Sequence, residues 1–341
     1  MKIAVDKKTL SVVSDDNNEY IYLFDDEKYE ELLDLNMHCM KYYLCDFVDI
    51  DLTKYNVGCI KKAKITDKDW KQLPAIKNFK IAIIIPNYNY EHTIEKCLSS
   101  IANQTYYNYE IIFVDDMSTD KSVDIAYSFV DKLTNIKIIQ LQQKRYNGGA
   151  RNEAYLYLSE DVDYIWYVDS DDWLENDTVL EKINYKLQSN PDVLFVGMNL
   201  VKNGKKSVAF IPQYKDKYEA MQGWSGSCGK VIKKSLATRQ ECLYNEGTLK
   251  EDRNQHYKVC INMKSFELLK APVYVWNRDN AKSVTTIREK VNWGTSTIRH
   301  WADTEQLYLT YKGDDERLDE ILKERVNKAK EEVLKGNDRQ W

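Results

Sequence analysis

Residues 81–116 read IAIIIPNYNYEHTIEKCLSSIANQTYYNYEIIFVDD, a stretch that alternates strand and helix patterns. The apolar runs at 81–86 and 110–114 are continuous, which is typical of strands buried on both faces. Between them, apolar residues recur at the spacing of one helix face: Ile94, Cys97, Leu98 and Ile101. A strand, a helix and a second buried strand together predict an α/β fold with a parallel sheet covered by helices.

The same alternation continues along the chain. Further apolar runs predict strands at 136–141, 164–168, 193–197 and 271–276. Helix patterns separate and follow them, at 118–133, 150–160, 180–187, 231–238, from Glu251 onward, and at 316–335. The buried stripe expected for the first of these helices is Val123, Ala126, Val130 and Leu133. Ligands in such folds bind beyond the carboxyl ends of the strands, so those ends are where a site is expected.

Polar residues follow three of the predicted strands: Asn87-Tyr88-Asn89, Asp115-Asp116 and Asp169-Ser170-Asp171-Asp172. Carboxylates as close as those of the last group repel one another, and a bound divalent cation removes this penalty. Oxygen ligands at a strand end are typical of Mg²⁺ or Mn²⁺ sites. The alternative is a polar turn in which Asp172 caps the next helix. The convergence of three polar strand ends favours a ligand site.

Composition sets limits on the class of protein. The chain has 341 residues, of which 43% are hydrophobic and 30% charged, with a formal net charge of −5. This size allows one large domain with a smaller one. The charge argues against a general nucleic-acid binder. No apolar run has the length of a transmembrane helix, and the N-terminus lacks the apolar core of a signal peptide, so a soluble cytoplasmic protein is expected. Seven cysteines without metal-type spacing predict reduced thiols.

Three segments are predicted along the chain. Residues 1–78 form a small α+β unit, with short strands in KIAVD, TLSVVS and EYIYLF and a helix at 27–44. Residues 79–300 form the main domain, and residues 301–341 form a helical C-terminal extension. Packing on the main domain, oligomerisation and acceptor recognition all stay open as roles of residues 1–78.

Several motifs occur together in one order. They are PNYN at 86–89, VDDMSTD at 114–120, GGARNEA at 148–154 and YVDSDDW at 167–173, followed by KEDRNQHYKV at 250–259 and WNRDNAKSVTT at 276–286. This set resembles the family 2 glycosyltransferases, which have the GT-A fold, a Rossmann-like sheet flanked by helices. The resemblance covers roughly residues 80–290. Arg253 stands where family members often have an aromatic residue.

The resemblance implies a nucleotide-sugar donor site. The implied donor-binding residues are Pro86, Asn87, Tyr88, Asn89, Asp116, Arg151, Asn152, Asp169, Ser170 and Arg278. In this reading the 86–89 segment and Asp116 bind the nucleoside, and Arg278 contacts the diphosphate. Two glycines precede Arg151 and would let the backbone approach the ligand closely. The local alternatives are a helix N-terminal charge for Asp115-Asp116 and a surface ion pair for Arg151.

The resemblance also implies a metal and a catalytic base. Mn²⁺ or Mg²⁺ would be held by Asp171 and Asp172, with Asp169 as the third candidate ligand, and would neutralise charge on the leaving diphosphate. Asp252 is the candidate base for the acceptor hydroxyl, and Glu251 would orient it or contact the acceptor. Ordinary capping of a helix start is the alternative for this pair.

The leading prediction is a metal-dependent, inverting glycosyltransferase, with a UDP-sugar as the favoured donor. The alternatives are a nucleotidyltransferase and a non-catalytic nucleotide- or sugar-binding module of the same fold. The residues after the first strand, PNYNYEH, supply no glycine-rich basic phosphate loop, which argues against the nucleotidyltransferase. A glycan, a wall polymer, a protein and modified nucleic acid all stay open as acceptors. Homo-oligomerisation through either extension also stays open.

Overall fold

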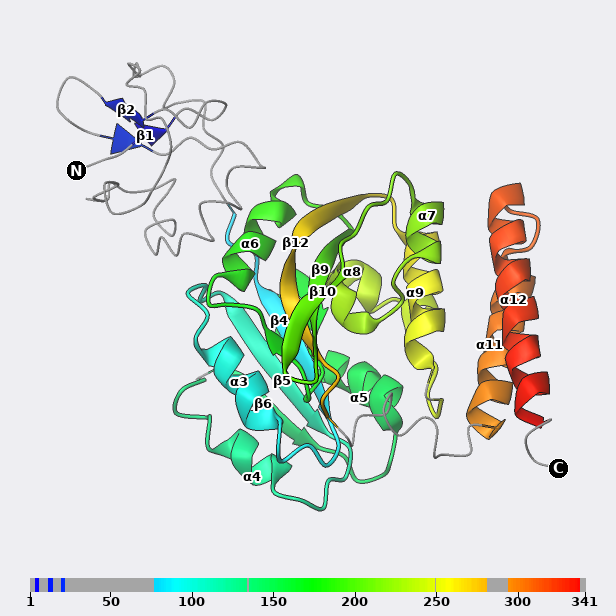
Figure 1. Ribbon diagram of the computed structural model, residues 1–341, viewed down its shortest axis with the longest axis horizontal. Helices are drawn as coiled ribbons and strands as arrows, with labels where there is room; N and C mark the ends of the chain where they lie inside the picture. The colour runs from blue at the N-terminus through cyan, green and yellow to red at the C-terminus, as the bar shows by residue number, and fades with distance from the viewer. Residues whose placement is uncertain are drawn as a thin grey trace. The chain divides into compact units, whose positions relative to one another are not determined.

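A computed structural model describes residues 77–133, 135–248, 250–280 and 294–337, together with the backbone of three short strands nearer the N-terminus (Figure 1). These are β1 (Ala4–Val5), β2 (Val12–Ser14) and β3 (Tyr20–Ile21), which pair as an antiparallel sheet. They confirm the strands predicted in KIAVD, TLSVVS and EYIYLF. The helix predicted at 27–44 lies outside the described residues.

Nine strands form the main sheet within the described residues, in the order β6-β5-β4-β7-β11-β9-β12-β8, with β10 paired to β9. The neighbours in β6-β5-β4-β7 are all parallel, and the other half of the sheet is mixed. The bounds are β4 (Ile81–Asn87), β5 (Tyr109–Asp115), β6 (Ile136–Gln140), β7 (Tyr164–Tyr167), β8 (Trp173–Leu174), β9 (Val193–Lys202), β10 (Lys205–Phe210), β11 (Lys230–Lys233) and β12 (Phe266–Asn277).

Helices cover both faces of the parallel half (Figure 1). Ala82 and Ile84 of β4 pack in one buried cluster with Ala150 and Ala154 of α5. Side chains alternate along a strand, so Ile83 points to the opposite face. The bounds are α3 (Ile94–Ala102), α4 (Ser122–Tyr127), α5 (Tyr146–Ala154), α6 (Val179–Lys186), α7 (Lys217–Gln222), α8 (Lys234–Ala237), α9 (Glu251–Asn262), α11 (Gly294–Tyr311) and α12 (Glu316–Asn337).

Several predicted elements differ from the structure in type or in their bounds. The helix predicted at 231–238 is wrong in its first half, because Lys230–Lys233 is strand β11, whose Val231 and Ile232 are fully buried between β7 and β9. Helix α4 ends at Tyr127, earlier than predicted. Past that point the chain buries Phe129, and Val130 is 43% exposed. Tertiary packing therefore overrode the apolar periodicity in both places.

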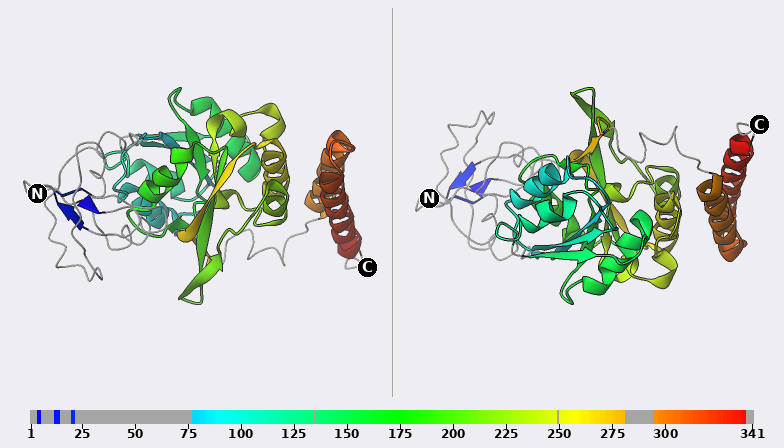
Figure 2. Two further views of the ribbon diagram at one scale, coloured as in Figure 1. Left: turned by 90° about the horizontal axis from the view of Figure 1, so that it is seen from above. Right: turned by 90° about the horizontal axis from the view of Figure 1, so that it is seen from below.

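Strand β9 runs five residues beyond the predicted end at residue 197 and forms a hairpin with β10. Figure 2 shows this hairpin extending beyond the rest of the sheet. The turn residues Asn203 and Gly204 have φ values of 53° and 68°, the left-handed conformation of a two-residue hairpin turn. The hairpin could therefore have been predicted from the Asn203-Gly204 pair in the sequence.

Contacts within the chain group its residues into two units. One contains Met1–Asn78 with Gln104–Tyr107 and Thr178–Gln188, and thus includes α6. The other contains the main sheet and both C-terminal helices, α11 and α12. The predicted domain boundaries at residues 78 and 300 stay predictions.

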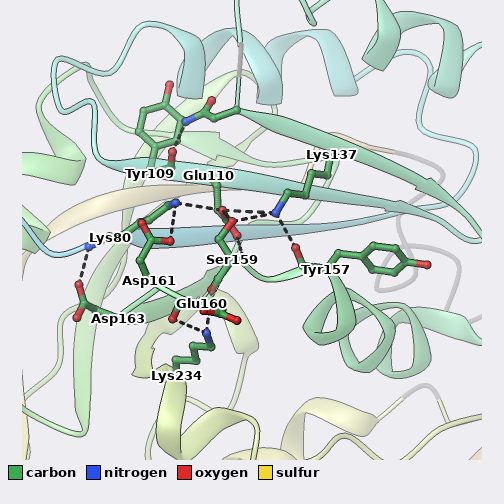
Figure 3. A network of polar contacts seen from close by, with 11 residues as sticks. Lys80, Tyr109, Glu110, Lys137, Tyr157, Ser159, Glu160, Asp161, Asp163 and Lys234 are labelled. Carbon is green, nitrogen blue, oxygen red and sulfur yellow. Dashed lines mark hydrogen bonds and ion pairs between the residues drawn. The ribbon is translucent and has the colours of Figure 1, made fainter.

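A network of charges lies where the parallel strands begin, at the edge of the sheet opposite their carboxyl ends (Figure 3). Glu110 is buried and accepts a hydrogen bond from the Ser159 amide at 2.9 Å. Its carboxylate lies 3.5 Å from Lys80 Nζ and 3.6 Å from Lys137 Nζ. Lys234 Nζ donates to the Ser159 carbonyl at 2.8 Å. These contacts hold the segment before β7 in place and leave the carboxyl ends of the strands for a site.

Candidate active site

The ends of β4 and β5 are joined by buried side chains. Asn87 and Asp115 are register partners, and Asn87 Nδ2 donates to Asp115 Oδ1 at 2.8 Å. Asp115 also accepts from the Ser118 amide at 2.8 Å, which shapes the turn after β5. Asn89, with a φ of 58°, accepts from the Thr119 amide at 2.8 Å. Asn87 Oδ1 is buried and has no hydrogen-bond partner among the described residues.

Asp116 holds the turn that precedes α5. Its two oxygens accept from the backbone amides of Arg145 at 2.7 Å and Tyr146 at 2.8 Å, and Lys144 Nζ lies 3.2 Å from Oδ2. Lys144 also lies over the ring of Tyr88, which is 43% exposed. The predicted contact of Asp116 with a base stays a prediction, and the structure adds a role in positioning α5.

Ser170 links the end of β7 to the end of β4. It is buried, and its hydroxyl donates to the carbonyl of Pro86. This bond places the Asp169–Asp172 segment beside the 86–89 segment, as expected from strands that are parallel neighbours. The two motifs predicted to form the donor site are therefore adjacent in the structure.

Asp172 is bound by protein groups on both carboxylate oxygens. Tyr274 donates to Oδ2 at 2.6 Å, and the Asn277 amide donates to Oδ1 at 2.7 Å. Burial, with the charges of Asp171 and Asp169, raises the pKa of Asp172 well above its ordinary value. Asp171 is 8% exposed and accepts from Asn280 Nδ2 at 3.0 Å. Both carboxylate oxygens of Asp172 are therefore occupied by groups of β12.

Arg151 connects the predicted donor and metal segment at the end of β7 to the predicted catalytic pair at the start of α9. This side chain of α5 is 3% exposed, and it binds Asp169 Oδ1 at 2.7 Å and Glu251 Oε1 at 2.8 Å. Burial alone would lower the pKa of Arg151, but the charges of Asp169, Tyr244 and Glu251 raise it well above its ordinary value. The guanidinium is therefore a fixed positive charge between the end of β7 and the start of α9.

The neighbours of Arg151 correct two details of its motif. A Cβ at Gly148 would lie 2.8 Å from the Asn245 carbonyl oxygen and 3.1 Å from Glu251 Cγ. The glycine therefore admits another part of the protein, not a ligand as predicted. Asn152 donates to the Tyr244 carbonyl and accepts from the Tyr244 amide, both at 3.0 Å. Its side chain holds the segment around Tyr244, which is a structural role.

Glu251 and Asp252 begin α9, as predicted, and differ in their surroundings. Glu251 is 6% exposed, and burial raises its pKa to about 7, although Arg151 opposes the shift. Asp252 is partly exposed, and burial also raises its pKa, against the charges of Lys230 and Arg151. A partly exposed carboxylate with a raised pKa can both reach a ligand and accept a proton.

Lys230 is a site residue that the sequence reading missed. It is 0% exposed, and its Nζ donates to the carbonyls of Ser225 at 2.9 Å and Gly226 at 2.8 Å. Burial lowers its pKa to about 8, and its charge acts on Asp252. A lysine at the start of a short strand carries no sequence signal of burial, so only the fold identifies it.

Replacing Lys230 with methionine is expected to lower the free energy of unfolding by about 1–3 kcal/mol, because the two loop carbonyls lose their buried donor. Urea denaturation would measure this change. Lys233→Met is the matched control on the same strand, since Lys233 makes one 3.4 Å bond in an exposed setting and should change stability by less than about 0.5 kcal/mol. Equal effects of the two substitutions would contradict the role given to Lys230.

Arg278 follows β12 directly and lies against one of a pair of tryptophans. Its guanidinium lies 4.7 Å from the ring centroid of Trp276, which packs edge-on against Trp224 at 5.3 Å. Trp224 Nε1 is buried without a partner among the described residues. The predicted contact of Arg278 with a diphosphate stays a prediction, and Ser283 of the same motif lies outside the described residues.

His256 of α9 has a structural role. It is fully buried, and its ring forms a hydrogen bond of 2.9 Å with the Ala220 carbonyl.

The sheet, its flanking helices and the site at the strand ends define a GT-A fold. A crystal structure of S. aureus TarS in complex with UDP-GlcNAc has the same fold, with a TM-score of 0.57 and 22% identity over 77% of this chain and 73% of that chain. Residues 82–240 match the family described as glycosyl transferase family 2. The chain therefore carries a family 2 glycosyltransferase domain, as the sequence motifs predicted.

Two curated relatives share part of this domain. A poly(ribitol-phosphate) beta-glucosyltransferase of Bacillus spizizenii is 39% identical over 117 residues, which are 33% of this chain and 18% of that protein. The glucosyltransferase WfgD of Escherichia coli, which is named for UDP-Glc and α-D-GlcNAc-diphosphoundecaprenol, is 31% identical over 145 residues, 42% of this chain and 55% of WfgD. The chain thus spans between a fifth and about half of the length of these relatives.

Two expectations about the cell environment can be compared with the structure. Among the described helices, none combines the length and the apolar character that crossing a membrane requires. The four cysteines in the described part of the chain, Cys97, Cys228, Cys242 and Cys260, are buried and free. Reduced thiols and a cytoplasmic location both stay predictions.

Proposed function

We propose that this protein transfers a sugar from a nucleotide-diphosphate donor, with UDP-sugars favoured, to a hydroxyl of an acceptor. The observation that carries the proposal is the bridge through Arg151. It joins Asp169, beside the predicted nucleotide segment, to Glu251, beside the predicted base. A single buried side chain thereby links the residues proposed to bind the donor to those proposed to act on the acceptor.

The carboxylates at the end of β7 fit a divalent cation that completes its coordination with other ligands. Within the described residues, no three His, Cys, Asp or Glu side chains form a metal site by themselves. Mg²⁺ commonly takes one or two carboxylates and fills its other positions with water and substrate phosphates. Asp171 and Asp169 are the residues proposed to hold the cation. Asp172, whose oxygens accept from Tyr274 and the Asn277 amide, would orient this segment.

The bound metal would supply positive charge to the departing diphosphate. Asp252 takes the proton of the acceptor hydroxyl, and the oxygen forms a bond to the anomeric carbon. The bond between that carbon and the diphosphate oxygen breaks, and its electron pair leaves with the nucleoside diphosphate. One displacement with one base inverts the anomeric centre. Arg151, which binds Asp169 Oδ1 at 2.7 Å, holds that carboxylate in place during this step.

The names of the relatives support a choice of substrates. TarS was solved with UDP-GlcNAc, and WfgD is named for UDP-Glc, so a UDP-sugar is the proposed donor. The Bacillus relative is named for a poly(ribitol-phosphate), and WfgD for a diphosphoundecaprenol-linked sugar. A bacterial surface glycan or wall polymer is accordingly the proposed class of acceptor.

Removal of divalent cations with EDTA is expected to abolish UDP-sugar turnover, and added Mn²⁺ should restore it, because the diphosphate otherwise leaves without charge compensation. In Asp171→Asn, the Mn²⁺ concentration for half-maximal turnover should rise at least about tenfold, since one anionic ligand is lost. Radiolabelled donor hydrolysis measures both effects. Asp161→Asn, at the opposite edge of the sheet, is the matched control and should leave the Mn²⁺ dependence unchanged. Full turnover in the presence of EDTA would refute the proposed dependence on a divalent cation.

A further inference from the structure

A cavity of about 220 Å³ is lined by residues of α7, α9, α11 and α12 and of the segment after α7. Its lining residues include Gly223, Ser225, Arg253, Arg325 and Lys328. Pockets for drug-sized ligands have volumes of about 300–1,000 Å³, so this cavity suits a smaller group.

The charge of the cavity is positive. Arg253 pairs with Glu332 at 3.3 Å, but the same Glu332 also pairs with Lys250. Arg325 has Glu324 at 4.0 Å, and that carboxylate is 64% exposed, so its screening of the guanidinium is weak. Lys328 is exposed at the cavity rim. Among the described residues, the cavity lining therefore has three cationic side chains and no carboxylate, and Glu332 and Glu324 are the carboxylates paired with Arg253 and Arg325.

Two residues of the cavity lining have buried polar atoms without a hydrogen-bond partner among the residues that the structure describes. His300 is 3% exposed, and its Nδ1 has no hydrogen-bond partner in the described part of the chain. The same holds for Nε of Arg325. Burial lowers the pKa of His300 to about 3, so its ring is neutral and can donate one hydrogen bond without adding charge. Dry cavities are apolar, whereas this lining is cationic, and water filling the cavity would not neutralise its charge.

We propose that this cavity binds a phosphate group of the acceptor, separate from the diphosphate of the donor. Arg253, Arg325 and Lys328 neutralise the anion, and their guanidinium and ammonium groups donate to its oxygens. Guanidinium forks match the geometry of phosphate oxygens. The assignment to the acceptor rests on the proposed glycosyl transfer, whereas the anion site itself does not.

The position of the cavity favours the acceptor over the donor. Arg253 follows the candidate base, Asp252, directly in α9. Ser225 lines the cavity, and its carbonyl is held by Lys230, whose charge acts on Asp252. Donor phosphates are expected at the β7 end instead, where Arg151 binds Asp169. A phosphate in the cavity would thus anchor an acceptor within reach of the base.

The test is calorimetric titration of the full chain with inorganic phosphate and with glycerol 3-phosphate, with the donor site saturated by UDP. The wild type is expected to bind with a Kd of about 1 mM or tighter. Arg325→Gln and Lys328→Gln should each weaken phosphate binding at least about fivefold and leave the UDP affinity within about twofold. Lys328 is exposed, so its variant should fold even where Arg325→Gln does not. Lys323→Gln, an exposed lysine of α12 outside the cavity, is the matched control.

The outcomes separate this inference from the proposed function. Absence of saturable phosphate binding in the presence of UDP would overturn the cavity site and leave the glycosyltransferase intact. Loss of phosphate binding on adding UDP would show that the anion occupies the donor site, which also overturns the proposal. An unchanged phosphate affinity of the Lys328→Gln variant would also overturn the cavity site. Phosphate binding in a protein that binds no UDP would support the anion site and count against glycosyl transfer.

Discussion

Asp252→Asn is expected to reduce sugar transfer by about 10²–10⁴-fold and to leave the affinity for UDP within about twofold. The factor is the typical contribution of a general base, and an amide cannot accept the proton of the acceptor hydroxyl. The pH profile of the wild type provides a second measurement. Because burial raises the pKa of Asp252, activity should fall with decreasing pH at values above the ordinary range of an aspartate.

Glu246→Gln is the matched control for Asp252→Asn, because Glu246 is a nearby acidic residue whose partner is Arg145. It should leave transfer within about twofold. Full activity of Asp252→Asn together with inactivity of Glu251→Gln would move the base to Glu251, whose pKa of about 7 also suits a proton acceptor. Donor binding without turnover in the wild type would favour the non-catalytic alternative.

Arg151→Gln is expected to lower the free energy of unfolding by about 3–5 kcal/mol and to lower transfer at least about 100-fold. Removal of one partner from a buried charge pair leaves the other charge uncompensated, and here two carboxylates, Asp169 and Glu251, lose the same cation. Urea denaturation measures the stability, and transfer assays at saturating donor measure the rate. Thermal shifts with UDP would show whether the folded variant still binds nucleotide.

Arg145→Gln controls for the loss of an arginine at the same helix. Arg145 precedes α5 and pairs with Glu153 and Glu246, but its side chain is 25% exposed. Ion pairs in such settings contribute up to about 1 kcal/mol, so the control should unfold at nearly the same urea concentration as the wild type. A similarly small effect of Arg151→Gln would refute the bridge as the link between the two halves of the site.

Local patterns predicted the parallel half of the sheet because its strands are short, apolar and separated by helices. The sequence also placed polar residues at three strand ends, and Ser170 does lie against Pro86. The strands of the mixed half were harder to predict from the sequence. β11 resembles a helix start until its burial between β7 and β9 is known, and β8 has only two residues. Pairing between distant strands decides such elements.

The sequence by itself determined the family of the domain and the residue types at the site, because motif order and strand ends are local properties of the chain. Only the tertiary structure decided which of those residues act on one another. Arg151, Asp169 and Glu251 lie up to 100 residues apart, and packing of α5 against α9 brings them within hydrogen-bond distance. The burial of Lys230 and the basic cavity beside Arg253 likewise arise from packing. Burial controls charge and solvation, and neither can be read from a residue's neighbours in sequence.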